Sequence, residues 1–250
     1  MTIRASLWLV PVLWTAGPAL AQTSIIDQMQ RTQQSVVSIR SDNTAAYQSK
    51  PLAARDPQSG RIVILRNVAA ASYRRQGAGV VIHGSGVIVT NAHVVEKAQH
   101  IFVTFSDGTE FPADVIGFEG DIDMALLKVV PPRPIAAVPL ADSDRVELGD
   151  EIFTIGSSAF LKQTLTGGKV IGLGTNRTEQ NHGRKRVDLL QTTVNLYEGD
   201  SGGPLFNRDG QLIGLMTAKE TAADHSSFAV PSNKIALHLW EYLKTLQEKP

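Results

Sequence analysis

Short apolar runs, separated by turn signals, fill the chain from residue 77 to residue 130. They are rich in valine and isoleucine, and glycine, proline or aspartate interrupts them, which predicts antiparallel β-strands rather than helices. The turns at 83–86 and 106–108 each lie between two such runs and predict two hairpins. The run MALLKVV at 124–130 is apolar almost throughout and predicts a buried strand.

Residues 131–149 break this pattern, because they contain four prolines and show no hydrophobic period. We therefore place a linker there, between an N-terminal barrel at 22–130 and a C-terminal unit at 150–250. The second unit repeats the short apolar runs, at 151–156, 165–174, 186–194, 202–207, 211–218 and 226–231. Strands at this spacing predict a second antiparallel barrel.

The stretch at 233–249 changes to a helical period. Its apolar stripe consists of Ile235, Leu239, Leu243 and Leu246. The predicted fold is therefore all-β, with two antiparallel β-barrels and a C-terminal α-helix packed on the second barrel.

The N-terminus reads as an export signal. Arg4 precedes an apolar stretch from Leu7 to Trp14, and Ala19-Leu20-Ala21 offers a small-x-small cleavage site, so residues 1–21 are predicted to be a signal peptide. An uncleaved membrane anchor is the alternative, but the apolar run is shorter than the roughly 20 residues that a span needs. A soluble periplasmic or secreted protein is the expectation, with no membrane contact after cleavage.

Two features follow the signal. Residues 24–33 predict a short helix and residues 35–40 a strand. Residues 41–76 are mostly polar and predict a long surface loop with one strand at 62–68. Either a solvated insertion or a regulatory loop fits this composition.

Composition narrows the function without naming it. The 24 basic and 24 acidic residues cancel, and no basic stripe suggests nucleic-acid binding. The chain has no cysteine, which excludes a thiol nucleophile, thiolate metal ligands and disulfides. No HExxH motif or phosphate-binding glycine loop appears, so we expect neither a metal nor a cofactor.

Candidate chemistry centres on YEGDSGGPL at 197–205, where three glycines surround Ser201. The pattern fits the nucleophile elbow of α/β-hydrolases, which place an acid and then a histidine after the serine. Asp209, Asp224 and His225 do follow Ser201, but without alternating strands and helices. The sequence therefore does not favour the α/β-hydrolase interpretation. A serine needs a base and an orienting acid, and the candidate bases are His83, His93, His100, His182, His225 and His238.

The order histidine, aspartate, serine fits better. His93 in TNAHVV follows a predicted strand, and Asp123, with Asp121 as its competitor two residues earlier, opens the buried strand at 124–130. All lie at strand ends or loops, where a rigid scaffold can bring them together with Ser201. The other histidines are expected to be surface or packing residues.

TNAHVV, DMALLKV and GDSGGPL together resemble the chymotrypsin-like serine proteases. The segments SVVSI, VIVTNAHVV, FTIGSSAF, LTGGKVIGLG, LLQTT and FAVPSNKI resemble, in order, the HtrA/Deg group of exported bacterial proteases, over residues 24–247. The group's Asp-aliphatic-Ala-Leu pattern favours Asp123 over Asp121. Two departures stand out: Asp200 replaces the group's usual asparagine, and no PDZ module follows the protease region before Pro250.

The resemblance implies roles for these residues. Ser201 would attack the peptide carbonyl, His93 would take its proton, and Asp123 would hold the imidazole tautomer. The backbone N–H groups of Gly199 and Ser201 would form the oxyanion hole. Asn195, at the pocket-base position, is not an acid, which argues against lysine or arginine specificity and leaves the group's small or medium aliphatic residues. Pocket-wall and peptide-pairing candidates are Leu196, Leu215, Met216, Thr217 and Ala218.

The implied function is an exported serine endopeptidase acting on unfolded or damaged polypeptides. A catalytically silent protease fold that binds polypeptides as a chaperone or scaffold is the alternative. A latent enzyme that needs a loop to order is a third reading, motivated by the insertion at 41–76. The group also implies a homo-oligomer, commonly a trimer, in which the segment at 24–34 could take part.

Overall fold

The computed structural model describes residues 30–45, 52–55, 62–65, 71–156, 164–178, 185–219 and 226–247. The predicted signal peptide at 1–21, most of the predicted helix at 24–33, and His182 and His225 lie outside the described residues. Within these ranges, no helix combines the length and apolar character needed to cross a bilayer.

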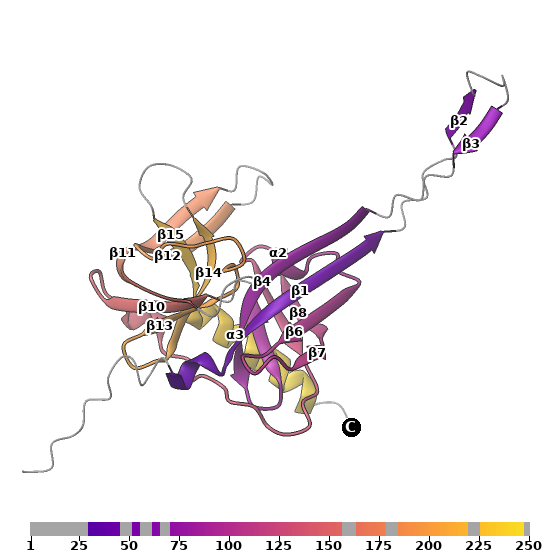
Figure 1. Ribbon diagram of the computed structural model, residues 1–250. Coiled ribbons are helices and arrows are strands. Elements are labelled where there is room, and N and C mark those ends of the chain that lie inside the picture. Colours follow the sequence, from indigo (N-terminus) through magenta and orange to yellow (C-terminus); the bar gives the residue numbers. More distant parts are fainter. Residues whose placement is uncertain are drawn as a thin grey trace, which may run out of the picture.

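Seven antiparallel strands of the N-terminal half form one sheet, in the order β7-β6-β1-β4-β5-β9-β8 (Figure 1). Their bounds are β1 Val36–Ala45, β4 Ala71–His83, β5 Val87–Thr90, β6 His100–Thr104, β7 Glu110–Pro112, β8 Asp114–Glu119 and β9 Met124–Lys128. Ala113 alone separates the two edge strands β7 and β8 in sequence. Because one continuous stretch of chain forms both edges, the sheet curls into a half-barrel.

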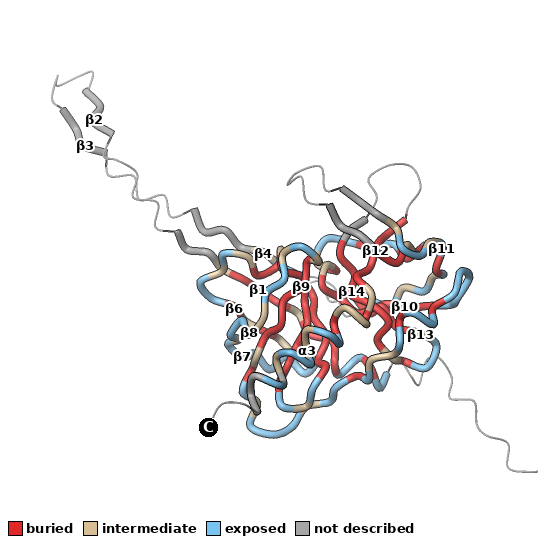
Figure 2. Tube along the Cα trace, turned by 180° about the vertical axis from the view of Figure 1, so that it is seen from behind, coloured by how far each residue is buried: buried red, intermediate tan, exposed pale blue. Residues whose placement is uncertain are grey.

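Two inner strands of this sheet, β5 and β9, are buried on both faces. Alternate residues enter different clusters: Val89 and Leu126 join one, and Ile88 and Leu127 join the other. The first cluster also holds Phe153 and other C-terminal residues, so it is the core between the two halves. Figure 2 shows this buried zone running through β9 and β14 (Leu212–Lys219). Two-sided burial explains why β9 lacks polar alternation.

Six strands of the C-terminal half form a closed barrel, in the order β10-β11-β12-β15-β14-β13. Apart from β14, their bounds are β10 Glu151–Gly156, β11 Thr164–Thr178, β12 Lys185–Thr192, β13 Pro204–Asn207 and β15 Ser227–Pro231. The predicted all-β class, with a C-terminal helix after the second barrel, is confirmed. The first barrel of the prediction is present as the half-barrel sheet.

The C-terminal helix α3 (Ser232–Gln247) packs on β14, β15 and β8. Of the predicted apolar stripe, Ile235 is fully buried and Leu239 packs against the same cluster. Its first residues also hold the segment between the two halves. The Ser232 hydroxyl donates to the Ala141 carbonyl at 2.6 Å, and Asn233 Nδ2 donates to the Asp142 carboxylate at 2.8 Å.

The segment at 131–149 contains one short 3-10 helix, η1 (Ser143–Arg145), and a single parallel bridge between Leu140 and Leu212. Its role as a linker between two domains stays a prediction. In the insertion, β2 (Leu52–Arg55) pairs antiparallel with β3 (Ile62–Leu65). The regulatory role of the insertion also stays a prediction.

Candidate functional site

His93 lies in the short helix α2 (Ala92–Val95). Asn91 alone separates this helix from the end of β5 at Thr90. Its main-chain N–H donates to Asp123 Oδ1 at 3.0 Å. Its ring Nδ1 lies 2.8 Å from Asp123 Oδ2 and 3.0 Å from Oδ1. The Asp123 side chain is fully buried, whereas the imidazole is 38% exposed. The carboxylate therefore faces Nδ1 of the ring and not Nε2.

Asp123 is held in an unusual backbone conformation at the turn before β9. Its φ is +57°, in the left-handed region that non-glycine residues seldom adopt. Asn91 Nδ2 donates to its carbonyl at 3.0 Å, and its own N–H donates to the Gly120 carbonyl at 3.2 Å. The Thr217 hydroxyl donates to Oδ2 at 2.5 Å. Asp121, the competing acid, is exposed, so the structure pairs Asp123 and not Asp121 with His93.

Ser201 occupies a tight turn that depends on glycine. Gly199 and Gly202 have φ values of +96° and +83°, which strain any other residue. A Cβ on Gly202 would lie 2.3 Å from the Ala78 carbonyl and 2.4 Å from Thr90 Oγ1. The glycines thus permit the turn of the C-terminal barrel to approach β4 and β5 of the N-terminal sheet.

Backbone hydrogen bonds fix this turn at the junction of the two halves. The Ala78 N–H donates to the Ser201 carbonyl at 2.8 Å, and the Gly202 N–H donates to the Met216 carbonyl at 2.8 Å. A Cβ built on Gly77 would lie within 3 Å of both the Ser201 carbonyl and Val94, the neighbour of His93. The turn therefore lies beside α2. The Ser201 hydroxyl makes no hydrogen bond to any described residue, His93 included.

The main-chain amides of Gly199 and Ser201 donate to no acceptor among the described residues. The amide between them is engaged, because the Asp200 N–H donates to the Tyr197 carbonyl at 3.1 Å. Two unengaged N–H groups on a positive-φ turn are the kind of donors that an oxyanion requires. Their assignment as an oxyanion hole stays a prediction.

Asp200 precedes the serine and is buried, with 5% of its surface exposed. Its Oδ2 accepts a hydrogen bond from the Tyr197 N–H at 2.8 Å. Burial raises the pKa of the Asp200 carboxyl, and the Tyr197 hydrogen bond only partly opposes this shift. The ionised carboxylate is thus destabilised in the folded protein.

Replacing Asp200 with asparagine should stabilise the protein at neutral pH. Because the folded pKa lies above the ordinary value of 3.8, the native state loses stability as pH rises through it. Asparagine is neutral and can still accept the Tyr197 hydrogen bond. Thermal unfolding from pH 3 to pH 8 should show a higher melting temperature for Asp200→Asn at neutral pH, with the difference shrinking below about pH 4.

Asp142 provides a control, because its pKa is shifted in the opposite direction to that of Asp200. Hydrogen bonds from Asn233 and the Asp144 N–H lower its pKa, so ionised Asp142 favours the folded state. Asp142→Asn should therefore not gain stability at neutral pH. A neutral-pH melting temperature of Asp200→Asn at or below that of the wild type would contradict the assignment of burial as the cause.

The predicted substrate-binding residues have different surroundings. Asn195 is exposed, and its Nδ2 donates to the Tyr197 hydroxyl at 3.4 Å. Leu196 packs in the cluster inside the C-terminal barrel. The side chains of Leu215 and Met216 are fully buried in cores, and their role in substrate binding stays a prediction.

The main chain of β14 is paired on both sides in its first part and on one side in its last part. Leu215 pairs with Pro204 on one side and Val230 on the other, and Met216 bonds Gly203 and Gly202 through its N–H and carbonyl. From Thr217 onward, β15 pairs with only one side of β14, and no described strand pairs with the other side. Sequence reasoning missed Lys219, which continues this edge.

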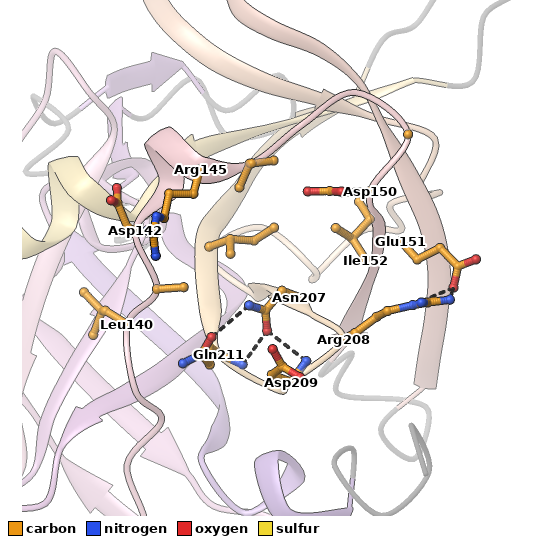
Figure 3. Close-up of a pocket in the computed structure, with 14 residues that line it drawn as sticks. Leu140, Asp142, Arg145, Asp150, Glu151, Ile152, Asn207, Arg208, Asp209 and Gln211 are labelled. Carbon is orange, nitrogen blue, oxygen red and sulfur yellow. Dashed lines mark hydrogen bonds and ion pairs between the residues drawn. The ribbon is translucent and has the colours of Figure 1, made fainter. Parts of the chain in front are cut away.

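Two cavities lie away from this site. A cavity of about 620 Å³ is lined by parts of residues 140–152 and 207–213, with the Arg208–Glu151 ion pair at its rim (Figure 3). A second, of about 530 Å³, is lined by Phe105, Phe111 and prolines 131, 132 and 134. Neither His93, Asp123 and Ser201 nor the predicted substrate-binding residues line either cavity.

The remaining described histidines stand apart from this site. His83 Nδ1 lies 2.9 Å from Ser85 Oγ in a turn, His100 begins β6, and His238 lies on α3 near Glu241. Among the described residues, no group of three or more histidine, aspartate or glutamate side chains is placed to hold a metal ion. The expectation of no metal or cofactor stays a prediction.

Known proteins match this chain over much of its length. Residues 77–215 match the family described as trypsin-like peptidase domain. The chain is 33% identical over 217 residues to the periplasmic pH-dependent serine endoprotease DegQ of Escherichia coli, covering 84% of this chain and 46% of DegQ. It is 37% identical over 157 residues to the putative serine protease HhoA of Synechocystis, covering 62% and 40%. The magnetosome formation protease MamE of Paramagnetospirillum magneticum is 37% identical over 179 residues, covering 69% and 24%. The chain thus spans less than half the length of each relative.

Proposed function

The chain belongs to the trypsin-like peptidase family, and from that premise we propose that it is a serine endopeptidase using His93, Asp123 and Ser201. The observation that carries the proposal is the buried Asp123 carboxylate, which binds both the main-chain N–H and Nδ1 of His93. Ser201 lies on a turn bonded to β4 beside that histidine, which supports its role as the nucleophile.

In the proposed mechanism, Ser201 Oγ attacks the scissile carbonyl while His93 Nε2 accepts its proton. Asp123 keeps the proton of the neutral ring on Nδ1. It also stabilises the imidazolium that forms when Nε2 takes the serine proton. The amides of Gly199 and Ser201 donate to the oxyanion of the tetrahedral intermediate. His93 then protonates the leaving amine, and water hydrolyses the acyl-enzyme by the reverse sequence.

Substrates are proposed to bind as extended polypeptides. The side of β14 that begins at Thr217 and continues through Ala218 and Lys219 offers main-chain groups with no described strand beside them. An extended peptide can add to such an edge by strand pairing. Unfolded or damaged polypeptides expose extended backbone along much of their length, and they are the proposed substrates.

Export and assembly belong to the same proposal. The signal-like sequence at 1–21 supports a periplasmic or secreted location, and the name of DegQ includes the word periplasmic. The resemblance to the HtrA/Deg group supports a homo-oligomer, commonly a trimer. Sedimentation of the mature protein tests the assembly, and sequencing the N-terminus of the exported protein tests cleavage after Ala21.

Labelling with a serine-directed fluorophosphonate tests the enzyme. We expect stoichiometric phosphonylation of the mature protein, located on the peptide that contains Ser201, together with cleavage of a peptide library. The extent of labelling should fall to background after heat unfolding. A folded protein that is neither labelled nor able to cleave any library peptide would contradict the endopeptidase assignment.

A latent enzyme or a silent polypeptide-binding fold is the second candidate. The Ser201 hydroxyl, which has no hydrogen bond to His93 among the described contacts, favours it. Contacts of this kind often tighten only when substrate binds. Labelling that rises on addition of a non-cleavable peptide indicates a latent enzyme, whereas peptide binding without labelling indicates a silent binding protein.

Thr217→Val should lower kcat by about tenfold, because the Asp123 carboxylate loses a hydrogen bond of roughly 1.5 kcal/mol. Valine keeps the shape of the buried side chain and removes only the hydroxyl that donates to Oδ2. Steady-state hydrolysis of a library-selected peptide measures the effect.

Thr154→Val is the matched control, since Thr154 is also buried and its hydroxyl donates to the Pro204 carbonyl. Both variants should lose stability, but only Thr217→Val should lose kcat. Equal losses of kcat would show that the Thr217 effect is general destabilisation.

A further inference from the structure

The helix α2 that carries His93 has four residues, and such a helix leaves its carbonyl groups without the usual helical partners. The Ala92 carbonyl accepts from the Glu96 N–H at 2.8 Å, and the Val95 carbonyl accepts from the Ala98 N–H at 3.1 Å. The carbonyls of His93 and Val94, which lie between them, accept hydrogen bonds from side chains elsewhere in the fold.

Two side chains of the N-terminal sheet do so. Arg75 Nη1 donates to the His93 carbonyl at 2.5 Å and reaches the Glu96 carbonyl at 3.4 Å. The buried Ser41 hydroxyl donates to the Val94 carbonyl at 2.6 Å. Ser41 on β1 and Arg75 on β4 are direct cross-strand partners. One cross-strand pair of the sheet therefore donates hydrogen bonds to two consecutive carbonyl groups of α2.

His93 is consequently held on both sides of its main chain. Its N–H donates to the Asp123 carboxylate, and its carbonyl accepts from the Arg75 guanidinium. These two bonds determine where the Cα of His93 lies, and hence where Nε2 lies relative to Ser201. The guanidinium donor is charged, and charge-assisted hydrogen bonds are about twice as strong as neutral ones.

We propose that Ser41 and Arg75 are positioning residues for the general base His93, acting through the carbonyls of α2. The inference rests on the proposed function, because it concerns the same proton transfer. Neither residue touches His93 Nε2 or Ser201, so neither is a catalytic group. Their effect is on the fraction of molecules, and of time, in which His93 has the geometry needed for the reaction.

Arg75→Met tests the proposal, because methionine keeps part of the aliphatic stem and removes every donor. We expect kcat for a library-selected peptide, and the rate of fluorophosphonate labelling, to fall by about 10- to 100-fold, as for small displacements of a reacting group. KM should change by less than about twofold, because neither residue lies on the proposed β14 peptide edge. Arg75→Lys, which restores a charged donor, should recover part of the loss.

Arg40→Met is the matched control. Arg40 is the neighbour of Ser41 on β1, but its guanidinium lies over the Phe102 ring and 3.5 Å from Glu110. It should leave kcat within about twofold of the wild type. Far-UV circular dichroism and thermal unfolding show that each variant is folded at the assay temperature.

Three results would overturn the proposal: a folded Arg75→Met protein with wild-type kcat, an equal kcat loss in Arg40→Met, or an effect confined to KM. If Arg75→Met does not fold, Ser41→Ala decides, because it removes one hydroxyl. It should lower kcat by about three- to tenfold, and an unchanged kcat would overturn the proposal. An inactive, unlabelled wild type refutes the endopeptidase itself, whereas an active wild type with an unaffected Arg75→Met refutes the positioning role alone.

Discussion

Replacing Ser201 with alanine is expected to lower kcat for peptide hydrolysis by about 10⁶-fold while the protein stays folded. The change removes the proposed nucleophilic oxygen, which makes no hydrogen bond to a described residue. The bonds that fix the turn, from Ala78 N–H to the Ser201 carbonyl and from Gly202 N–H to the Met216 carbonyl, are main-chain bonds that alanine preserves. The free energy of unfolding should therefore change by less than about 0.5 kcal/mol. Single-turnover hydrolysis and denaturant unfolding measure the two quantities.

The double variant Ser201→Ala/His93→Ala makes the prediction sharper. Residues that act as one unit are non-additive, so the double variant should be no slower than Ser201→Ala within about threefold. Ser85→Ala, in an exposed turn, is the control and should keep wild-type activity. A Ser201→Ala protein that retains more than about a tenth of wild-type kcat would show that another group is the nucleophile.

The strands of both halves were predictable because their side chains follow local rules. The run at 151–156 coincides with β10, and the run at 226–231 contains β15, since short β-branched runs between turn signals leave few alternatives. Sheet closure was less accessible. That β7 and β8 are opposite edges of one curled sheet depends on pairings between residues far apart in the chain, which no local pattern contains.

The residues of the candidate site also differ in how far the sequence could predict them. His93 and Ser201 could be proposed as site residues from the sequence because short motifs surround them, and the motif match favoured Asp123. Their supports could not, because Thr217 reaches Asp123 across 94 positions and Ser41 reaches Val94 across 53. A threonine or serine in a strand has the same local signature whether its hydroxyl supports a triad or solely satisfies a backbone carbonyl.

The surroundings of Leu215 and Met216 were also beyond the sequence. The sequence predicted a strand near the serine and suggested that it meets substrate. Which stretch of that strand is free depends on where β13 ends, and β13 pairs no further along β14 than Leu215. The turn at Gly202 and Gly203 then takes both main-chain groups of Met216. The free edge is consequently displaced towards Thr217 and Lys219, beyond the apolar core residues.

Asp123→Asn is expected to lower kcat by about 10⁴-fold, a larger effect than loss of any other support of His93. The carboxylate accepts from the His93 main-chain N–H, the His93 ring and the Thr217 hydroxyl. Asparagine has one acceptor oxygen for these donors, and its NH₂ group must face one of them. If it faces Nδ1, the ring adopts the tautomer with the proton on Nε2, which cannot accept the serine proton. The pH dependence of kcat/KM, measured with a library-selected peptide, reports the change.

Asp121→Asn separates this effect from a general loss of negative charge at the turn. Asp121 is exposed two residues away, so its substitution should leave kcat within about twofold of the wild type. Fluorophosphonate labelling of Asp123→Asn should slow by a similar factor to kcat, because phosphonylation uses the same activated hydroxyl. If Asp121→Asn were the slower variant, the acid would be assigned to the wrong aspartate. The bond between His93 and the buried Asp123 carboxylate would then be structural, holding α2 to β9 without contributing to proton transfer.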